Sequence, residues 1–314
     1  MRLCSVSVPG DGPPRLCAVA DDGRAYPVGS YRDVAELITD GDAGPLGKAV
    51  ESAGVASDAI GTWDDLAGGG AGESGVRLEA PIRPAEVWAA GVTYERSRAA
   101  RMSESTEADV YDRVYAAERP ELFFKATGAR VVGPNAAVGL RSDSTWQVPE
   151  AEIGLVLGSG GEVAGYTLGN DMSSRDVEGA NPLYLPQAKI FAGACALGPA
   201  VVPAEEVEDP YDIGIELTVR RAGEVAFADA TSTGALHVTF EKLIEHLYRD
   251  NWVAPGTVLL TGTGIIPPDD FTLKPGDVIE ISSRAVGVLT NHCVAAGELQ
   301  PPPGWARRYA EGSR

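Results

Sequence analysis

The segment from Trp146 to Glu178 carries three acidic residues whose spacing is suited to metal binding. Glu150 and Glu152 lie two residues apart in the strand-like run EAEIGLVLG, and alternate residues of a strand point to the same face. The turn SGG leads into a second strand-like run, EVAGYTLGND, which ends at Asp171. If the strands pair, three carboxylates surround one point and suit a hard divalent cation. Spacing alone favours a plainer interpretation, in which the glutamates lie on a solvated strand face and the aspartate in a turn.

The order of further motifs along the chain favours the metal site. E-x-E followed by G-Y-x-x-x-x-D-x-S-x-R-D resembles the metal-binding core of the fumarylacetoacetate hydrolase superfamily. Four more segments follow the order expected in that superfamily: RPELFFKA at 119–126, NPLYLPQAKIFAG at 181–193, TVLLTGTG at 257–264 and LKPGDVIEI at 273–281. The resemblance covers about residues 81–295. It implies that Glu150, Glu152 and Asp171 hold Mg²⁺, with Mn²⁺ or Ca²⁺ as substitutes, which agrees with the preference of these ions for oxygen ligands.

Two residues are candidates for proton transfer, Glu121 and Lys189. Lys189 lies in a run with few other charges, where burial without a partner is costly, and the resemblance implies a lysine beside the ligand. Glu121 lies just before Phe123 and Phe124, and burial beside aromatic rings raises the pKa of a carboxyl group. Such a group suits general acid–base catalysis, although a surface glutamate at a strand start fits the sequence equally well. We expect the pair to share the proton transfer, without a separate role for each.

The substrate-binding candidates are Tyr94, Arg175, Thr263 and, again, Lys189. Thr263 lies in a glycine-rich turn, where backbone N–H groups and its hydroxyl can approach a carboxylate. Related hydrolases carry a catalytic histidine a few residues after the tyrosine, but here that position is Ser97 or a neighbour, and no histidine precedes His237. Within the superfamily, the chain is most similar to the branch that dehydrates 2-keto-3-deoxy sugar acids. This implies conversion of 2-keto-3-deoxy-D-arabinonate, or a similar acid, to 2,5-dioxopentanoate.

Two alternative functions stay open. A hydrolase that cuts the C–C bond of an acylpyruvate would use the same metal site but needs a residue that activates water. A non-catalytic metal-binding scaffold would show metal-dependent stability without turnover.

The elements that must position these residues form a mainly β chain with some helix (α+β). Helical spacing predicts a helix over 31–40, a second over 47–63, a long one over 93–120 and one over 239–250. Alternating apolar residues predict a hairpin over 211–229. The resemblance implies a rolled β-sandwich. We expect a small N-terminal α+β domain at 1–80, the catalytic domain at 81–300 and a tail at 301–314, with the first boundary after the flexible run GGGAGESG.

The composition narrows the range of partners and compartments. The chain has 314 residues with a net charge of −19, which argues against nucleic acid and anionic membranes as partners. A small 2-keto acid is the expected partner, so the site needs local positive charge. Four cysteines without C-x-x-C spacing indicate free thiols in a reducing compartment. The sequence contains no run apolar enough for a membrane helix, so we expect a cytoplasmic protein, and the resemblance implies a homodimer or a dimer of dimers.

Overall fold

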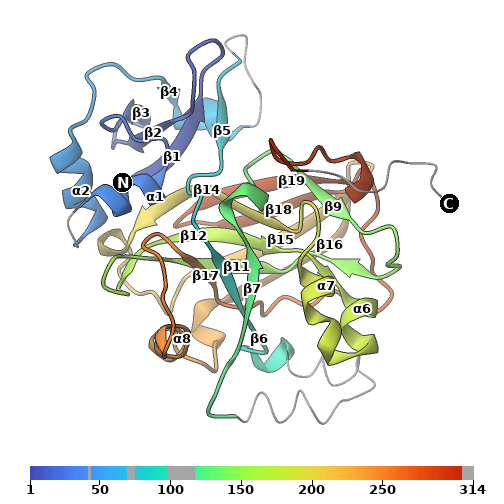
Figure 1. The fold of residues 1–314 in the computed structure, drawn as a ribbon. Coiled ribbons are helices and arrows are strands. Elements are labelled where there is room, and N and C mark those ends of the chain that lie inside the picture. The colour runs from blue at the N-terminus through green and yellow to red at the C-terminus, as the bar shows by residue number, and fades with distance from the viewer. Residues whose placement is uncertain (42–43, 69–74, 98–116, 306–314) are drawn as a thin grey trace.

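The structure, a computed structural model, describes residues 1–314 apart from 42–43, 69–74, 98–116 and 306–314 (Figure 1). Strands are its commonest regular element, and two β-sheets pack face to face, with helices at the edges. The predicted mainly β, α+β class is therefore confirmed. Most of the helix predicted over 93–120 lies outside the described residues.

The strands of the larger sheet come from many parts of the sequence. Its strands are β1 Arg2–Ser7, β2 Arg15–Val19, β3 Arg24–Pro27, β4 Gly61–Thr62, β5 Arg77–Glu79, β6 Val87–Gly91, β7 Glu121–Ala126, β8 Val131–Val132, β11 Ala151–Leu157, β12 Val163–Asp171, β14 Cys195–Pro203 and β17 Val258–Leu260. Their order is β4-β3-β2-β1-β14-β12-β11-β17-β6-β7, with β5 paired to β1 and β8 to β14. β11, β12, β17, β6 and β7 lie together, so the candidate residues in and beside them come from one end of this sheet.

The smaller sheet covers one face of the larger one. Its strands are β9 Ala137–Leu140, β15 Gly214–Arg221, β16 Glu224–Ser232, β18 Val278–Ser283 and β19 Gly287–Ala295, in the order β16-β15-β18-β19-β9. A separate short pair joins β10 Gln147–Val148 to β13 Ser173–Ser174. Ile215, Leu217 and Val219 are buried and alternate with less buried residues along β15. β15 pairs with β16, which confirms the predicted hairpin.

The main hydrophobic core lies between the two sheets. Ile153 and Leu155 of β11 and Leu168 of β12 pack there against Leu217 and Ile281 from the smaller sheet. Because side chains alternate along a strand, the residues between them point to the opposite face. Glu152 therefore faces away from this core, which leaves its carboxylate for a polar site.

The helices are short. They are α1 Val34–Asp40, α2 Leu46–Ala53, α3 Trp63–Ala67, α6 Arg175–Ala180, α7 Leu185–Lys189 and α8 Phe240–Tyr248, with 3₁₀ turns η1 Gly128–Arg130, η2 Pro182–Tyr184, η3 Ala204–Glu206, η4 Thr233–Ala235 and η5 Ala296–Glu298. The helices predicted over 31–40 and 239–250 are confirmed as α1 and α8. The helix predicted over 47–63 is too long, because α2 ends at Ala53 and is followed by Gly54, whose φ of 78° a helix cannot continue.

The N-terminal strands extend the larger sheet at the end opposite β7 (Figure 1). β1 pairs with β14, with Leu3 opposite Val201, and part of this segment has a small core of its own around Cys4, Val6 and Leu66. The domain boundary near residue 80 stays a prediction, and the sheet runs across it.

The structure describes all four cysteines. Cys4, Cys17, Cys195 and Cys293 are all buried free thiols, as the sequence predicted. In the part of the chain that is described, no helix has the length and apolar character needed to cross a membrane.

Candidate metal centre

The three predicted carboxylates meet at one end of the β11–β12 hairpin. Ala151 pairs with Asn170, and the backbone N–H of Asp171 donates to the carbonyl of Glu150 at 3.0 Å. This register brings Glu150, Glu152 and Asp171 together, and each offers an oxygen within 4.8 Å of the others. All three side chains are buried. The structure therefore has the strand pairing that the acidic spacing predicted.

Two lysines neutralise part of this charge. Lys189, at the end of α7, donates from Nζ to Glu150 Oε2 at 2.8 Å, to Asp171 Oδ2 at 3.0 Å and to Ser173 Oγ at 2.6 Å. Lys125, on β7, forms an ion pair with Asp171 and donates to the carbonyl of Met172 at 3.0 Å. Both ammonium groups are buried, so each needs these acceptors.

Arg175 completes the ring of charges around the carboxylates. It begins α6, is 2% exposed, and its guanidinium lies 3.1 Å from Glu150 Oε1. Three cationic side chains thus face three carboxylates inside an acidic protein, which supplies the local positive charge that an anionic ligand requires.

Glu152 is the carboxylate least compensated by its surroundings. Burial raises its pKa well above the usual value, and the charges of Asp171 and Glu150 raise it further. Its Oε2 accepts the backbone N–H of Gly262 at 2.7 Å, while its Oε1 has no hydrogen-bond partner among the described residues. A buried acceptor without a donor, beside two more carboxylates, fits a site for a hard divalent cation.

Glu121 lies at the start of β7, opposite Gly91 of β6. A side chain on Gly91 would collide with the Glu121 carboxylate, so the carboxylate lies over the glycine. Phe123 shares the strand face of Glu121 and has Lys189 Nζ 5.6 Å from its ring centre. Glu121 is thus on the face of β7 that borders Lys189, and its catalytic role stays a prediction.

Tyr94 lies near enough to Glu152 to respond to its charge, and Thr263 follows Gly262, the backbone donor to Glu152. Tyr94 is 1% exposed, and its hydroxyl has no hydrogen-bond partner among the described residues. Burial raises its pKa, and the charge of Glu152 raises it further. The hydroxyl of Thr263 accepts the Ile265 N–H at 3.1 Å within its own turn. The substrate-binding roles of these two residues and of Arg175 stay predictions.

Sequence reasoning missed Lys125 and the hydrogen bond from the Gly262 N–H. The run LFFKA leaves Lys125 with only apolar neighbours, the same signal that pointed to Lys189. The Gly262 N–H gave no signal, because its acceptor Glu152 is more than a hundred residues away along the chain.

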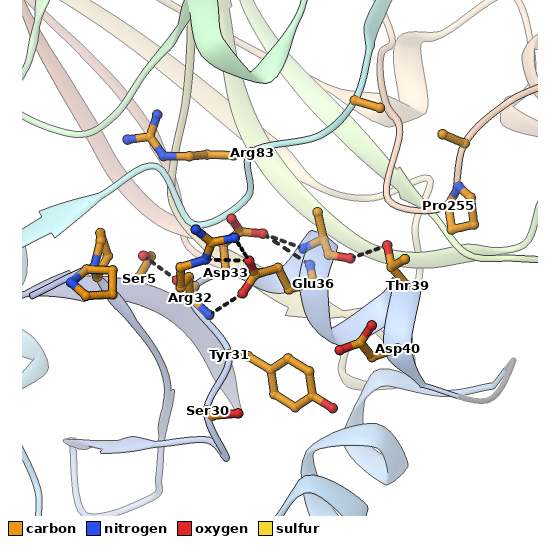
Figure 2. A pocket seen from close by; sticks show the side chains of 15 residues that line it. Ser5, Ser30, Tyr31, Arg32, Asp33, Glu36, Thr39, Asp40, Arg83 and Pro255 are labelled. Carbon is orange, nitrogen blue, oxygen red and sulfur yellow. Dashed lines mark hydrogen bonds and ion pairs between the residues drawn. The ribbon is translucent and has the colours of Figure 1, made fainter. Parts of the chain in front are cut away.

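A cavity of about 790 Å³ lies elsewhere, between the N-terminal strands, α1 and the loop around Pro255 (Figure 2). Its lining contains none of the predicted site residues. Arg32 is paired with Glu36, Arg83 with Glu79, and Asp33 caps α1. Four of the five charged side chains that line this cavity are thus used within the fold, so the carboxylate cluster is the better candidate site.

The sequence of this fold matches that of a known family. The sequence model of the fumarylacetoacetate (FAA) hydrolase C-terminal family matches residues 86–294, and the chain belongs to this family.

Two curated relatives are dehydratases. A probable 2-keto-3-deoxyxylonate dehydratase of Haloferax volcanii is 48% identical over 211 residues, covering 67% of this chain and 73% of the relative. A 2-dehydro-3-deoxy-D-arabinonate dehydratase of Saccharolobus solfataricus is 45% identical over 219 residues, covering 68% and 73%. The solved structure of a 2-keto-3-deoxy-D-arabinonate dehydratase complexed with magnesium and 2,5-dioxopentanoate matches with a TM-score of 0.81 and 35% identity, covering 94% of this chain and 99% of that one.

Proposed function

We propose that this protein is a hydro-lyase that converts a 2-keto-3-deoxypentonate to 2,5-dioxopentanoate. The observation that carries the proposal is the buried triad of Glu150, Glu152 and Asp171, surrounded by cations, in a chain similar over nearly its whole length to a dehydratase complexed with that product. The ring of cations suits a substrate that is itself an anion.

The names of the two relatives point to one substrate in the D-series. D-xylonate and D-arabinonate differ only at C2 and C3. In a 2-keto-3-deoxy acid C2 is a carbonyl and C3 a methylene, so neither carbon is a stereocentre. The two names then describe the same five-carbon acid, and the proposed substrate is 2-keto-3-deoxy-D-arabinonate or a close analogue.

Mg²⁺ is the proposed cofactor, held by one oxygen each of Glu150, Glu152 and Asp171, and Mn²⁺ or Ca²⁺ can replace it. Hard oxygen ligands suit all three ions. When bound, the ion supplies Lewis-acid polarisation of a carbonyl and compensates negative charge that develops on its oxygen.

The proton transfers are assigned to Glu121 and Lys189 together. The reaction first takes a proton from C3 and expels the C4 hydroxyl, which leaves with a proton as water. A second proton then moves from C5 to C3. The resulting enol takes a proton at C4 while its hydroxyl loses one, and this forms the C5 aldehyde. Each stage needs one group to accept a proton and one to donate it, so two titratable side chains at the centre suffice.

Four residues are proposed to hold the substrate, and Lys189 is one of them. Arg175 and Lys189 carry positive charge suited to its carboxylate, and the hydroxyls of Tyr94 and Thr263 suit its carboxylate and hydroxyl groups. We further propose a homodimer or a dimer of dimers in the cytoplasm. The four buried free thiols support a reducing compartment.

Adding Mg²⁺ to the metal-free protein is expected to raise its Tm by several degrees. Ligand at about a hundred times its Kd stabilises the folded state by about 2.7 kcal/mol. Glu152→Gln should remove most of this gain, because it takes away the least compensated carboxylate. Scanning calorimetry of both proteins with EDTA and with Mg²⁺ tests the expectation. If titration calorimetry finds no divalent cation bound to the wild type, the proposed centre is wrong.

Incubation with 2-keto-3-deoxy-D-arabinonate and Mg²⁺ is expected to give a product that an aldehyde dehydrogenase oxidises to 2-oxoglutarate. Ser97 supports dehydration over hydrolysis, because its hydroxyl donates to the Tyr94 carbonyl at 2.7 Å and accepts the Tyr94 N–H at 3.2 Å. It is thus engaged with the backbone of its own turn. A panel of sugar acids and acylpyruvates is the measurement. Cleavage of acylpyruvates without dehydration would identify a C–C hydrolase, and metal binding without any turnover a scaffold.

A further inference from the structure

Thr93 lies against Gly262, the backbone donor to Glu152, and no hydrogen bond joins it to the three carboxylates. It follows β6, is completely buried, and its hydroxyl donates to the carbonyl of Thr261 at 2.7 Å. The carbonyl of Thr93 accepts the N–H of His237 at 2.8 Å, so the residue is held on its backbone side as well.

The carbonyl of Thr261 and the N–H of Gly262 belong to one peptide group. A trans peptide is planar, and its C=O and N–H point in opposite directions. At one end of this plane the Thr93 hydroxyl binds the oxygen, and at the other end the N–H donates to Glu152 Oε2 at 2.7 Å. The orientation of the whole plane thus decides whether Glu152 faces a donor or an acceptor.

The residues on either side of this peptide allow its plane to rotate. Both the N–H and the hydroxyl of Thr261 donate to the carbonyl of Ile153, at 3.0 Å and 2.9 Å, which fixes the residue before the plane to β11. The residue after the plane is Gly262, with a φ of 87°, and glycine accepts both signs of φ. A flipped plane would point its carbonyl oxygen at the Glu152 carboxylate.

We propose that Thr93 is a positioning residue that locks the 261–262 peptide so that its N–H holds Glu152 ready to bind the metal. The space around the lock is tight, because a Cβ on Gly262 would come within 2.0 Å of the Thr93 hydroxyl oxygen. Removal of the hydroxyl leaves the buried Thr261 carbonyl without this donor and frees the plane to turn. Glu152 then loses the donor that orients it. The proposal rests on the proposed metal centre.

The test is the Mg²⁺ affinity of Thr93→Val, measured by titration calorimetry. Valine has nearly the same shape as threonine but no hydroxyl. Loss of a residue that orients a metal ligand weakens metal binding by roughly 10- to 100-fold, and we expect Thr93→Val in that range. Thr93→Ser, which keeps the hydroxyl, should bind Mg²⁺ nearly as the wild type does.

Thr257→Val is the matched control. Thr257 is also completely buried, but its hydroxyl has no hydrogen-bond partner among the described residues, so its Mg²⁺ affinity should be unchanged. If Thr93→Val does not fold, Thr93→Ala removes the same hydroxyl without adding volume and serves in its place.

The outcomes separate this proposal from the metal centre. A wild type that binds no Mg²⁺ overturns the centre itself. A wild type that binds Mg²⁺, together with folded Thr93→Val or Thr93→Ala proteins of unchanged affinity, overturns only the lock. An equal loss of affinity in Thr93→Ser would also overturn it, because packing and not the hydroxyl would then be responsible.

Discussion

Replacing Glu121 by glutamine should lower kcat by roughly 10²-fold or more, the usual scale for losing a general acid–base group. The amide keeps the shape of the side chain over Gly91, but it cannot act as a general acid or base near neutral pH. Glu121 is not one of the three carboxylates that are proposed to bind the metal. Its replacement should therefore leave Mg²⁺ affinity and folding nearly unchanged. The measurement is kcat, KM and Mg²⁺ affinity on one substrate.

Glu118→Gln is the control for this variant. Glu118 lies three residues earlier and is exposed, so its replacement should leave all three values as in the wild type. Near wild-type turnover in Glu121→Gln would show that Glu121 has no catalytic role. Lys189 would then be the remaining candidate for proton transfer.

Replacing Lys189 by methionine is expected to impair stability, substrate binding and turnover together. Its ammonium group is shared by Glu150 and Asp171, and removing one partner of a buried ion pair costs about 3–5 kcal/mol. The metal-free variant should therefore melt well below the wild type, and Mg²⁺ should restore more of its Tm than it adds to the wild type. KM for the anionic substrate should rise, because a nearby positive charge is gone.

Lys48→Met separates this effect from a general loss of positive charge. Lys48 is exposed on α2, and its replacement should change neither Tm nor KM. A Lys189→Met protein whose metal-free Tm and KM equal those of the wild type would contradict the role given to this lysine.

The acidic centre could be predicted because its pattern is local. Glu152 and Asp171 lie in two successive strands joined by a short glycine turn, and Glu150 directly precedes the first strand, so one hairpin brings the three together. Lys189 was predicted from the cost of burying a charge together with the family resemblance, and its two carboxylate contacts agree with that argument.

The supporting contacts could not be predicted, because they join distant parts of the chain. Thr93 and Thr261 are 168 residues apart, and no spacing rule connects them. The pairing of β1 with β14 was equally invisible, since the apolar pattern of a strand does not name its partner. The end of α2 is a different case, because Gly54 marks it locally in the sequence and glycine commonly ends helices, so the longer prediction overlooked an available signal.

The pairing of β1 with β14 also sets an order of events during synthesis. β1 and β2 form a local hairpin that can close as soon as both have left the ribosome, whereas Leu3 can meet Val201 only after β14, 198 positions further along the chain, has been made. Until then β5 can pair with Ser5–Ser7 of β1, but the edge at Leu3 has no partner, and unpaired strand edges associate readily with other chains. The beginning of the chain thus waits for β14, and β14 also pairs with β12, the strand that carries Asp171.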